Sequence, residues 1–413
     1  MTAHRMAAID AEFYWMSAKV PSDDFQLWAF GGQPTDLGAA IDELCSRARG
    51  CPDLTMRVHD GSPLTFPQWV PAPVSREQVV CHDLVDPSWH GCLAAIVGLA
   101  DHQLDIRQML WRVHVFTPVF GIPGVDGPGT VVLWQYPHAL AGGVRASAMG
   151  AWLFGRAVPL PEVRPSRAGF LPWLALDAAR THRQLVRDTH AGLVAPGIGY
   201  RPLLPTNARP TGVRSLRTLV RHRSQMPGPT VTVAVLAAVS TALSGLFGDA
   251  ADSLAAEVPM AKFGVPPAYN HFGNVVVGLY PELDWDARVQ RIAADLANGR
   301  RRFEHPSKRS ADRAFAAVPA ALLRWGVSLF DPDARPTQVL GNTVVSSNNR
   351  GPADLNFGGL PVVLTATYPP LSSVMGLTHG VHGIGETIAI SVNAAESAID
   401  DIDDYLDRLD AAL

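Results

Sequence analysis

The chain has 413 residues, of which 47% are hydrophobic and 17% are charged, and its formal net charge is −4. This length exceeds what one ordinary hydrophobic core can organise, so we expect two domains of roughly 200 residues each. The composition excludes an intrinsically disordered chain, and the small negative charge argues against a nucleic-acid partner.

Hydrophobic periodicity predicts a mixture of helices and strands. We expect, in chain order, a strand at 25–30, helices at 37–49 and 93–104, strands at 111–116 and 131–136, helices at 146–154, 173–193 and 231–243, a strand at 275–279, a helix at 285–303, a strand at 343–347, a hairpin at 362–366, a strand at 387–392 and an acidic helix at 399–413. This mixture predicts an α/β or α+β sandwich.

The domain boundaries are predicted from breaks in this pattern. A proline-rich break at 159–172 and a Pro/Gly/Arg-rich stretch at 196–229 flank one predicted helix. We therefore expect an amino-terminal domain at 1–160, a linking region at 161–229 and a carboxyl-terminal domain at 230–413.

Neither a membrane span nor a metal site is expected. The longest apolar run, 231–243, is shorter than the roughly 20 residues that cross a bilayer, and the amino terminus does not resemble a signal peptide. We therefore expect a cytoplasmic protein with reduced cysteines. The cysteines, which we interpret as small core residues, do not form the paired CxxC units of a zinc site; they are Cys45, Cys51, Cys81 and Cys92.

The segment at 133–143, LWQYPHALAGG, is the most informative part of the chain. A run of large apolar residues ends at Pro137 and His138 and gives way to small residues, which indicates a buried strand that carries an imidazole to a glycine-rich turn. An imidazole can accept a proton near neutral pH. A core histidine bonded to a backbone carbonyl is the alternative interpretation.

Several segments in order resemble the wax ester synthase/diacylglycerol acyltransferase (WS/DGAT) family. They are IDAEF at 9–13, LDIRQMLW at 104–111, FGN at 272–274 with LYP at 279–281, SNNRGP at 347–352, and the acidic terminal helix. This family belongs to a larger group of CoA-dependent acyltransferases that includes condensation domains and chloramphenicol-acetyltransferase-like enzymes. The resemblance implies two chloramphenicol-acetyltransferase-like sandwich domains with a substrate tunnel between them.

The family's central motif, HHxxxDG, stands here as PHALAGG at 137–143. The second histidine, the family's general base, is kept as His138. Pro137 replaces the first histidine and Gly142 replaces the aspartate, while Thr232 and Val233 stand in place of a family Asn-Asp pair. Loss of the aspartate removes a polar anchor of the loop, whereas glycine preserves any unusual backbone angle there.

The resemblance implies His138 as catalytic base and a set of residues that bind substrate or stabilise an oxyanion. The expected substrate-binding residues are Gly142, Gly143, Asn274, Ser347, Asn348 and His382. Turn formation and strand capping are alternative roles for the polar members of this set. His379 and His382 would point to opposite faces of one strand, which argues against a shared metal.

The implied function is transfer of an acyl group from a CoA or carrier-protein thioester to a hydroxyl or amine of a small molecule. The altered motif favours an acceptor from specialised metabolism over storage lipid. The expected partners are the acceptor, the thioester donor and an acyl carrier protein, with no bound cofactor. Two alternatives remain: the same fold catalysing cyclisation, hydrolysis or elimination on a thioester or polyketide-like substrate, and a non-catalytic ligand-binding protein.

Overall fold

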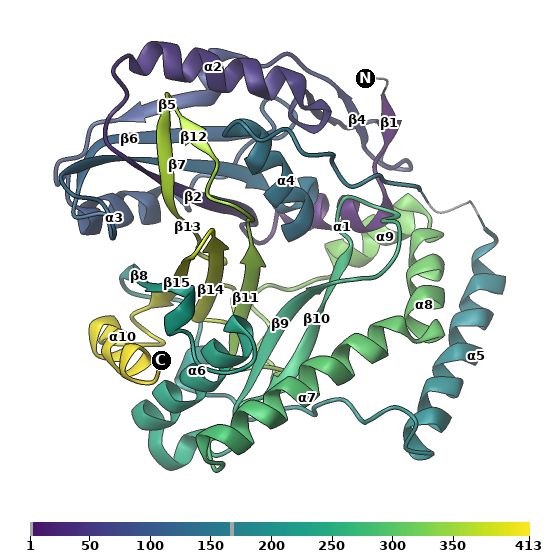
Figure 1. Ribbon diagram of the computed structural model, residues 1–413. Coiled ribbons are helices and arrows are strands. Elements are labelled where there is room, and N and C mark those ends of the chain that lie inside the picture. The colour runs from purple at the N-terminus through teal and green to yellow at the C-terminus, as the bar shows by residue number, and fades with distance from the viewer. Residues whose placement is uncertain (1–2, 166–168) are drawn as a thin grey trace.

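The computed structural model describes residues 3–165 and 169–413. Two lobes, each built on a six-stranded sheet, lie one above the other (Figure 1). The first sheet has the order β12 (Asn356–Phe357), β13 (Leu360–Thr367), β2 (Asp23–Gly31), β7 (Pro128–Pro137), β6 (Arg112–Phe120) and β5 (Val79–His82). The second has the order β10 (Phe272–Gly278), β9 (Ala255–Ala261), β11 (Thr343–Asn349), β14 (Leu377–Ile384), β15 (Thr387–Ala395) and β8 (Arg214–His222). This confirms the mixed α/β, two-lobed architecture.

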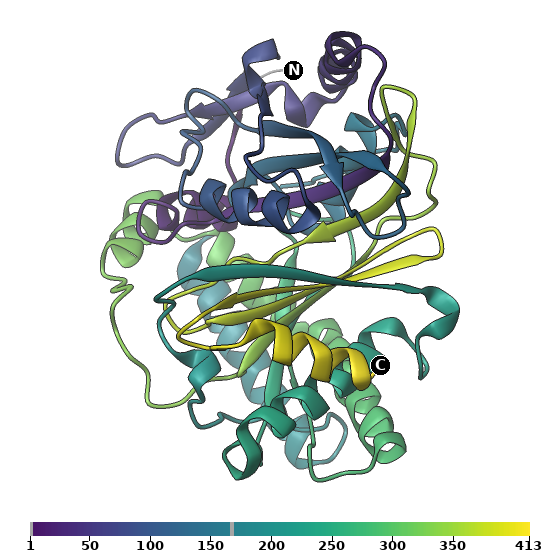
Figure 2. The same ribbon diagram turned by 90° about the vertical axis from the view of Figure 1, so that its left-hand side faces the viewer.

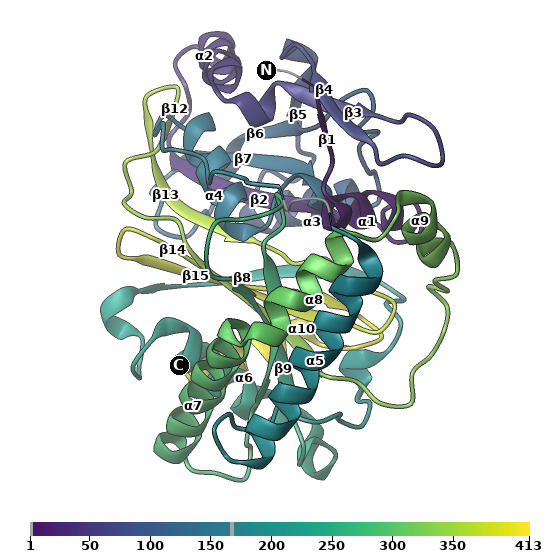
Figure 3. The same ribbon diagram turned by 90° about the vertical axis from the view of Figure 1, so that its right-hand side faces the viewer.

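A small three-stranded sheet and ten helices complete the described chain. The small sheet, β1 (His4–Arg5), β4 (Gln68–Pro71) and β3 (Met56–His59), belongs to the first lobe. The helices are α1 (Ala8–Met16), α2 (Leu37–Gly50), α3 (Trp89–Leu99), α4 (Gly143–Leu153), α5 (Leu171–His190), α6 (Val231–Phe247), α7 (Trp285–Glu304), α8 (Pro306–Ala316), α9 (Ala320–Ser328) and α10 (Ile402–Ala411). Helices α5, α7 and α8 stand together on one side of the second lobe (Figure 3).

Alternation along β2 explains how the first sheet is covered on both faces. Trp28 and Phe30 point into the core beneath α2 and α4, whereas Leu27 and Ala29 point toward α3 and the second sheet. The second set packs with residues of β8 and β15, so the two sheets meet through a shared apolar cluster. Figure 2 shows β2 and β13 lying over β8, β14 and β15.

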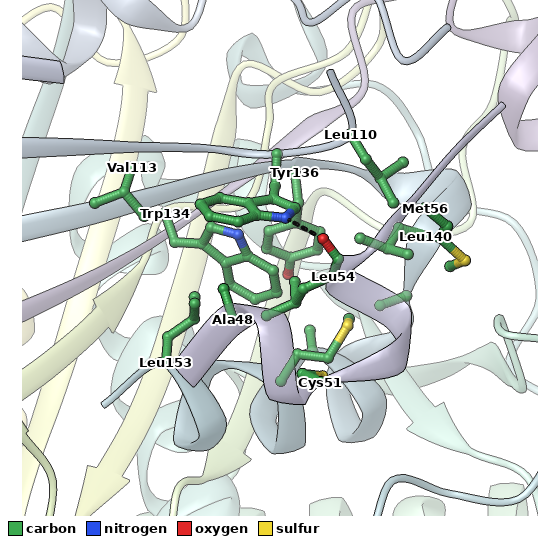
Figure 4. Close-up of a cluster of buried hydrophobic side chains, with 14 of the residues drawn as sticks. Ala48, Cys51, Leu54, Met56, Leu110, Val113, Trp134, Tyr136, Leu140 and Leu153 are labelled. Atoms are coloured by element: carbon green, nitrogen blue, oxygen red, sulfur yellow. Dashed lines mark hydrogen bonds between the residues drawn. The ribbon is translucent and has the colours of Figure 1, made fainter. Parts of the chain in front are cut away.

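Strand β7 is buried on both faces, which accounts for the apolar residues at successive positions along it. Trp134 stacks on Tyr136 with ring centroids 4.1 Å apart. Figure 4 shows these rings packed with Leu54 and with Leu140, which lies beyond the end of the strand. The core therefore holds both the strand and the turn that follows it.

Helix α6 is the buried helix that the apolar run predicts, with ten buried residues, eight of which belong to the second core. It is longer than expected. Within the described residues, the segment Val231–Ala251, which continues past the apolar run at 231–243, is long and apolar enough to span a membrane by length and composition alone. More than half of its most apolar window is buried in the protein, as in a core helix.

The sheets do not follow the predicted domain boundaries at two places. Strand β8 lies within the expected linking region but forms an edge of the second sheet by pairing with β15. Strands β12 and β13 lie within the expected carboxyl-terminal domain but extend the first sheet through β2. Residues 166–168 of the linking region lie outside the described residues. The division of the chain into domains at residues 160 and 229 remains a proposal.

Two local predictions were wrong. The turn of the predicted hairpin lies between β12 and β13, not within 362–366, which belong to one strand. Cys81 is exposed, unlike the other three cysteines.

Candidate active site

His138 lies where strand β7 ends, in a short 3-10 turn formed by His138–Leu140. Its backbone N–H donates to the Ser22 carbonyl at 3.1 Å, which ties the turn to the segment entering β2. Leu140 is fully buried in the first core. The sequence-based expectation of an imidazole on a turn after a buried strand is therefore confirmed.

The imidazole forms an ion-pair contact with Asp24 on the neighbouring strand. His138 Nδ1 lies 2.6 Å from Asp24 Oδ2, and the two side chains are 25% and 14% exposed. The register between β2 and β7 creates this contact, because it pairs Asp24 with Tyr136, two residues before His138. Burial acts to lower the pKa of His138, but the charge and hydrogen bond of Asp24 and the charge of Asp10 outweigh it, so the pKa is raised.

Two phenylalanines enclose the imidazole. Phe13 of α1 meets the His138 ring edge to face, with centroids 4.4 Å apart, and Phe272 of β10 meets it at 5.5 Å. Phe13 and Phe272 also stack on each other at 6.2 Å. The imidazole is therefore packed between an element of the first lobe and an element of the second.

Both phenylalanines line a cavity of about 1290 Å³ between the lobes. Its walls include Phe66 and Trp69 of the first lobe and Tyr269 of the second. His138 itself is not among the lining residues in the described part of the chain, so the imidazole adjoins the cavity through its aromatic neighbours. Cavities between lobes are common small-molecule sites.

Asn270 and Asp10 anchor the turn beneath the imidazole. Asn270 Nδ2 donates to the His138 carbonyl at 2.9 Å and to Asp10 Oδ1 at 3.0 Å. The Asp10 carboxylate also accepts the backbone N–H groups of Tyr269 and Asn270. Burial raises the pKa of Asp10 to about 6 although these donors and the charge of Arg145 act to lower it.

Gly142 is favoured by space and not by backbone angle. Its φ is −76° and its ψ is 169°, which any residue can adopt, so the turn needs no unusual angle here. A Cβ here would lie 3.1 Å from Phe272 Cδ1 and 3.5 Å from Asn270 Oδ1. Glycine thus lets Phe272 approach the loop.

Gly143 and Asn348 join the loop to the second lobe. Asn348 Nδ2 donates to the Gly143 carbonyl at 3.0 Å and to Ser147 Oγ at 2.8 Å. Ser147 also accepts a hydrogen bond from the buried Arg350 guanidinium. The contacts of Asn348 are structural, and a role for it or for Gly142 and Gly143 in binding substrate stays a prediction.

The other predicted residues occupy three different environments. Asn274 lines the cavity, and its amide donates to Glu257 Oε2 at 2.9 Å. Ser347 accepts a hydrogen bond from Thr232 at 2.8 Å. His382 is buried in β14, its Nδ1 has no hydrogen-bond partner among the described residues, and burial followed by the charge of Arg350 lowers its pKa well below the ordinary value. Their substrate-binding roles stay predictions.

His379 and His382 point to opposite faces of β14, as expected. His379 lies 2.7 Å from the Tyr405 hydroxyl in the second core, whereas His382 faces Arg350. No group of three or more potential metal ligands occurs among the described residues.

Sequence reasoning did not identify Asp24 and Asn270. Asp24 stands directly before the predicted strand at 25–30, so an acidic residue at a strand entrance was the available signal. Asn270 lies just before the FGN segment. Nothing in the local pattern of either residue indicates a contact with a histidine more than 100 positions away.

Comparison with known proteins identifies a matching family model and similar solved structures. Residues 269–413 match the family described as the WS/DGAT C-terminal domain. No curated protein sequence matches the chain at a significant level. Among solved structures, the wax ester synthase/diacylglycerol acyltransferase from Marinobacter aquaeolei is similar over 99% of this chain and 98% of its own, with 16% identity and a TM-score of 0.64.

Two condensation domains are similar in fold. The first condensation domain of the calcium-dependent antibiotic synthetase, in complex with a substrate analogue, has 15% identity and a TM-score of 0.61 over 100% of this chain and 95% of its own. The starter condensation domain of rhizomide synthetase, in complex with C8-CoA and Leu-SNAC, has 14% identity and a TM-score of 0.60 over 100% and 93%.

These matches show that the chain has the two-lobed fold of the wax ester synthase and condensation-domain structures. Its last 145 residues match the WS/DGAT C-terminal domain. The family resemblance predicted from the sequence motifs is confirmed.

Proposed function

We propose that this protein is an acyltransferase that moves an acyl group from a CoA or carrier-protein thioester to a hydroxyl or amine, with His138 as general base. The observation that carries this proposal is the retained motif histidine packed between Phe13 and Phe272, which both line the cavity between the lobes. The similarity to a wax ester synthase and to a condensation domain that binds C8-CoA supports the choice of donor.

The chemistry requires one proton acceptor. Because Asp24 occupies Nδ1, His138 offers Nε2 to the acceptor's O–H or N–H. As Nε2 takes this proton, the oxygen or nitrogen forms a bond to the thioester carbonyl carbon. The C–S bond then breaks, and the imidazolium returns the proton to the leaving thiolate. An ester or amide and a free thiol are released, and the histidine is regenerated.

The hydrogen bonds of the three candidate side chains indicate which of them is free to donate to an oxyanion. Both N–H groups of the Asn348 amide donate within the protein, whereas the Asn274 amide, which lines the cavity, has a second N–H beyond its bond to Glu257. The Ser347 hydroxyl accepts from Thr232 and keeps its own proton, but Ser347 is not among the described residues that line the cavity. We therefore place Asn274 before Ser347 and Asn348 as the side chain that stabilises the tetrahedral oxyanion.

We also propose that the acceptor is a small molecule of specialised metabolism and that the enzyme acts in the cytoplasm. The loss of the motif aspartate and of the Asn-Asp pair supports a departure from storage-lipid synthesis. An acyl carrier protein remains an alternative donor to CoA, as the similarity to condensation domains suggests.

The test is an acyl-transfer assay with mass detection. Purified protein is incubated with acyl-CoA or N-acetylcysteamine thioesters and a panel of alcohols and amines. We expect transfer products, and we expect His138→Ala to lower turnover by about 10²- to 10⁴-fold with little change in substrate binding. Thermal unfolding of both proteins establishes that the variant is folded.

The alternatives give different results. Hydrolysed or cyclised products in place of acceptor adducts would assign the fold to another thioester reaction. A wild-type protein that turns nothing over but is thermally stabilised by ligand would be a binding protein. Full activity in a folded His138→Ala variant would make the imidazole a packing residue.

A further inference from the structure

Asp24 is the residue that the known motif does not account for. It lies at the start of β2 and is mostly buried, and its Oδ2 is 2.6 Å from His138 Nδ1. The contact links residues 114 positions apart, and the pairing of β2 with β7 fixes it. A carboxylate at this distance accepts an N–H from imidazole in a short, charge-assisted hydrogen bond.

We propose that Asp24 is the positioning residue for His138: it holds the proton on Nδ1, fixes the ring orientation and leaves Nε2 as the basic atom. This inference deepens the proposed acyl transfer, on which its catalytic consequence rests. A neutral imidazole has two tautomers, and the hydrogen bond at one ring nitrogen determines which nitrogen is free. Asp24 thus acts through the base and does not exchange protons with substrate.

The other charged groups nearby leave Asp24 as the carboxylate that contacts the imidazole. Asp10 of α1 is the other carboxylate that influences His138. Its two oxygens accept N–H groups from Tyr269 and Asn270, so it is engaged elsewhere. Arg350, which follows β11, forms no ion pair with a carboxylate among the described residues, and its positive charge faces both Asp24 and the Tyr136 hydroxyl. The buried Asp23 is adjacent to Asp24 in sequence, but its carboxylate accepts hydrogen bonds from the Leu104 backbone N–H and the Gln135 side-chain amide.

This arrangement explains how the chain manages without the motif aspartate. Asp24 reaches the imidazole from β2, whereas position 142 follows the histidine in its own loop and faces Phe272 and Asn270. The carboxylate that orients the base is therefore supplied by a different strand.

The test measures the imidazole directly. Protein with ¹⁵N-labelled histidine is titrated by NMR, which reports the protonation of Nδ1 and Nε2 separately, and His138→Ala assigns the resonances. In wild type we expect the neutral ring to carry its proton on Nδ1. In Asp24→Asn we expect the pKa of His138 to fall by about one unit or more, because a carboxylate within 4–6 Å of an ionisable group shifts it by that amount.

Activity is measured in parallel as the pH dependence of kcat/KM. A base must be neutral to act, so the acidic limb should move to lower pH in Asp24→Asn, with plateau turnover reduced by about 10-fold or more. Asp24→Glu, which keeps the charge, should keep the pKa raised. The matched control is Asp188→Asn. Asp188 Oδ2 lies 3.1 Å from His305 Nε2 in a second His–Asp contact among the described residues, and its replacement should change neither the pKa of His138 nor the pH dependence of activity.

The outcomes separate the two proposals. If Asp24→Asn leaves the pKa and tautomer of His138 unchanged, this inference is overturned whatever the activity. If both change as expected but neither protein transfers acyl groups to any acceptor, the role of Asp24 in setting the imidazole stands and the proposed acyltransferase function fails.

Discussion

Restoring the motif aspartate with Gly142→Asp is predicted to destabilise the protein without raising its activity. The new Cβ would lie 3.1 Å from Phe272 Cδ1, so Phe272 or the loop must move, and such overpacking costs about 1–3 kcal/mol. Gly142 is also the N-cap of α4, where an aspartate gains about 1 kcal/mol or less. This gain does not offset the cost of overpacking together with the cost of the added charge.

The added charge has no partner in this loop. Asn270 Oδ1, an acceptor without a donor among the described residues, lies 3.5 Å from the Cβ position, and Asp10 lies on the other side of the same amide. A second carboxylate would raise the pKa of Asp10 further above its present value of about 6. We therefore expect a net loss of about 1–3 kcal/mol in the free energy of unfolding at pH 7.

Urea unfolding of three variants distinguishes these contributions. Gly142→Ala should lie within about 1 kcal/mol of wild type, because the backbone angles suit alanine and its lower unfolded-state entropy offsets the tight contact. Gly142→Asn adds the bulk without the charge. The deficit of the aspartate variant relative to the asparagine variant should grow as the pH rises from 5 to 7, where both carboxylates ionise. A Gly142→Asp protein as stable as wild type and more active would refute this reasoning.

Two further predictions concern buried ionisable groups, one in each lobe. Arg145→Met should lower the free energy of unfolding, measured in urea, by about 3–5 kcal/mol, because it leaves the buried Asp53 carboxylate, 2.7 Å from Arg145 Nε, without its cation. Adding Asp53→Asn should recover part of this loss, and no recovery would contradict the pair's role. Burial lowers the pKa of His379 to about 4, so the folded state binds its proton less readily than the unfolded state, and stability should fall by up to about 3 kcal/mol as the pH drops from 6.5 to 4. His379→Gln should flatten this dependence, whereas an unchanged pH slope would show that His379 does not contribute to it.

Local pattern predicted the elements that are buried on all sides. The largely apolar sequence of β7 and the all-round apolarity of α6 both correspond to elements buried in a core. Strand β8 was missed because it is an edge strand that contains three arginines and only one fully buried residue, so it shows no alternating pattern and its composition is typical of a loop. Its identity as a strand depends on pairing with β15, which no local window contains.

The polar partners of His138 outside its own loop were not predicted. His138 was found because histidine, glycine and a preceding apolar run are adjacent in sequence. Asp24 and Asn270 contact it across 114 and 132 positions, through strand register in one case and through the meeting of the two lobes in the other. The sequence places these residues, but only the tertiary arrangement makes them neighbours.

The departures from the family motif are connected through one small residue. Glycine at 142 leaves the space into which Phe272 packs, and Phe272 with Phe13 encloses the imidazole. A side chain at 142 could anchor the loop only by displacing that ring. Anchoring is provided instead by Asn270, and the imidazole is bonded to Asp24 on the adjacent strand. A motif that has lost its aspartate can therefore keep a fixed histidine, provided that the segment before β10 supplies the anchor and β2 supplies the carboxylate.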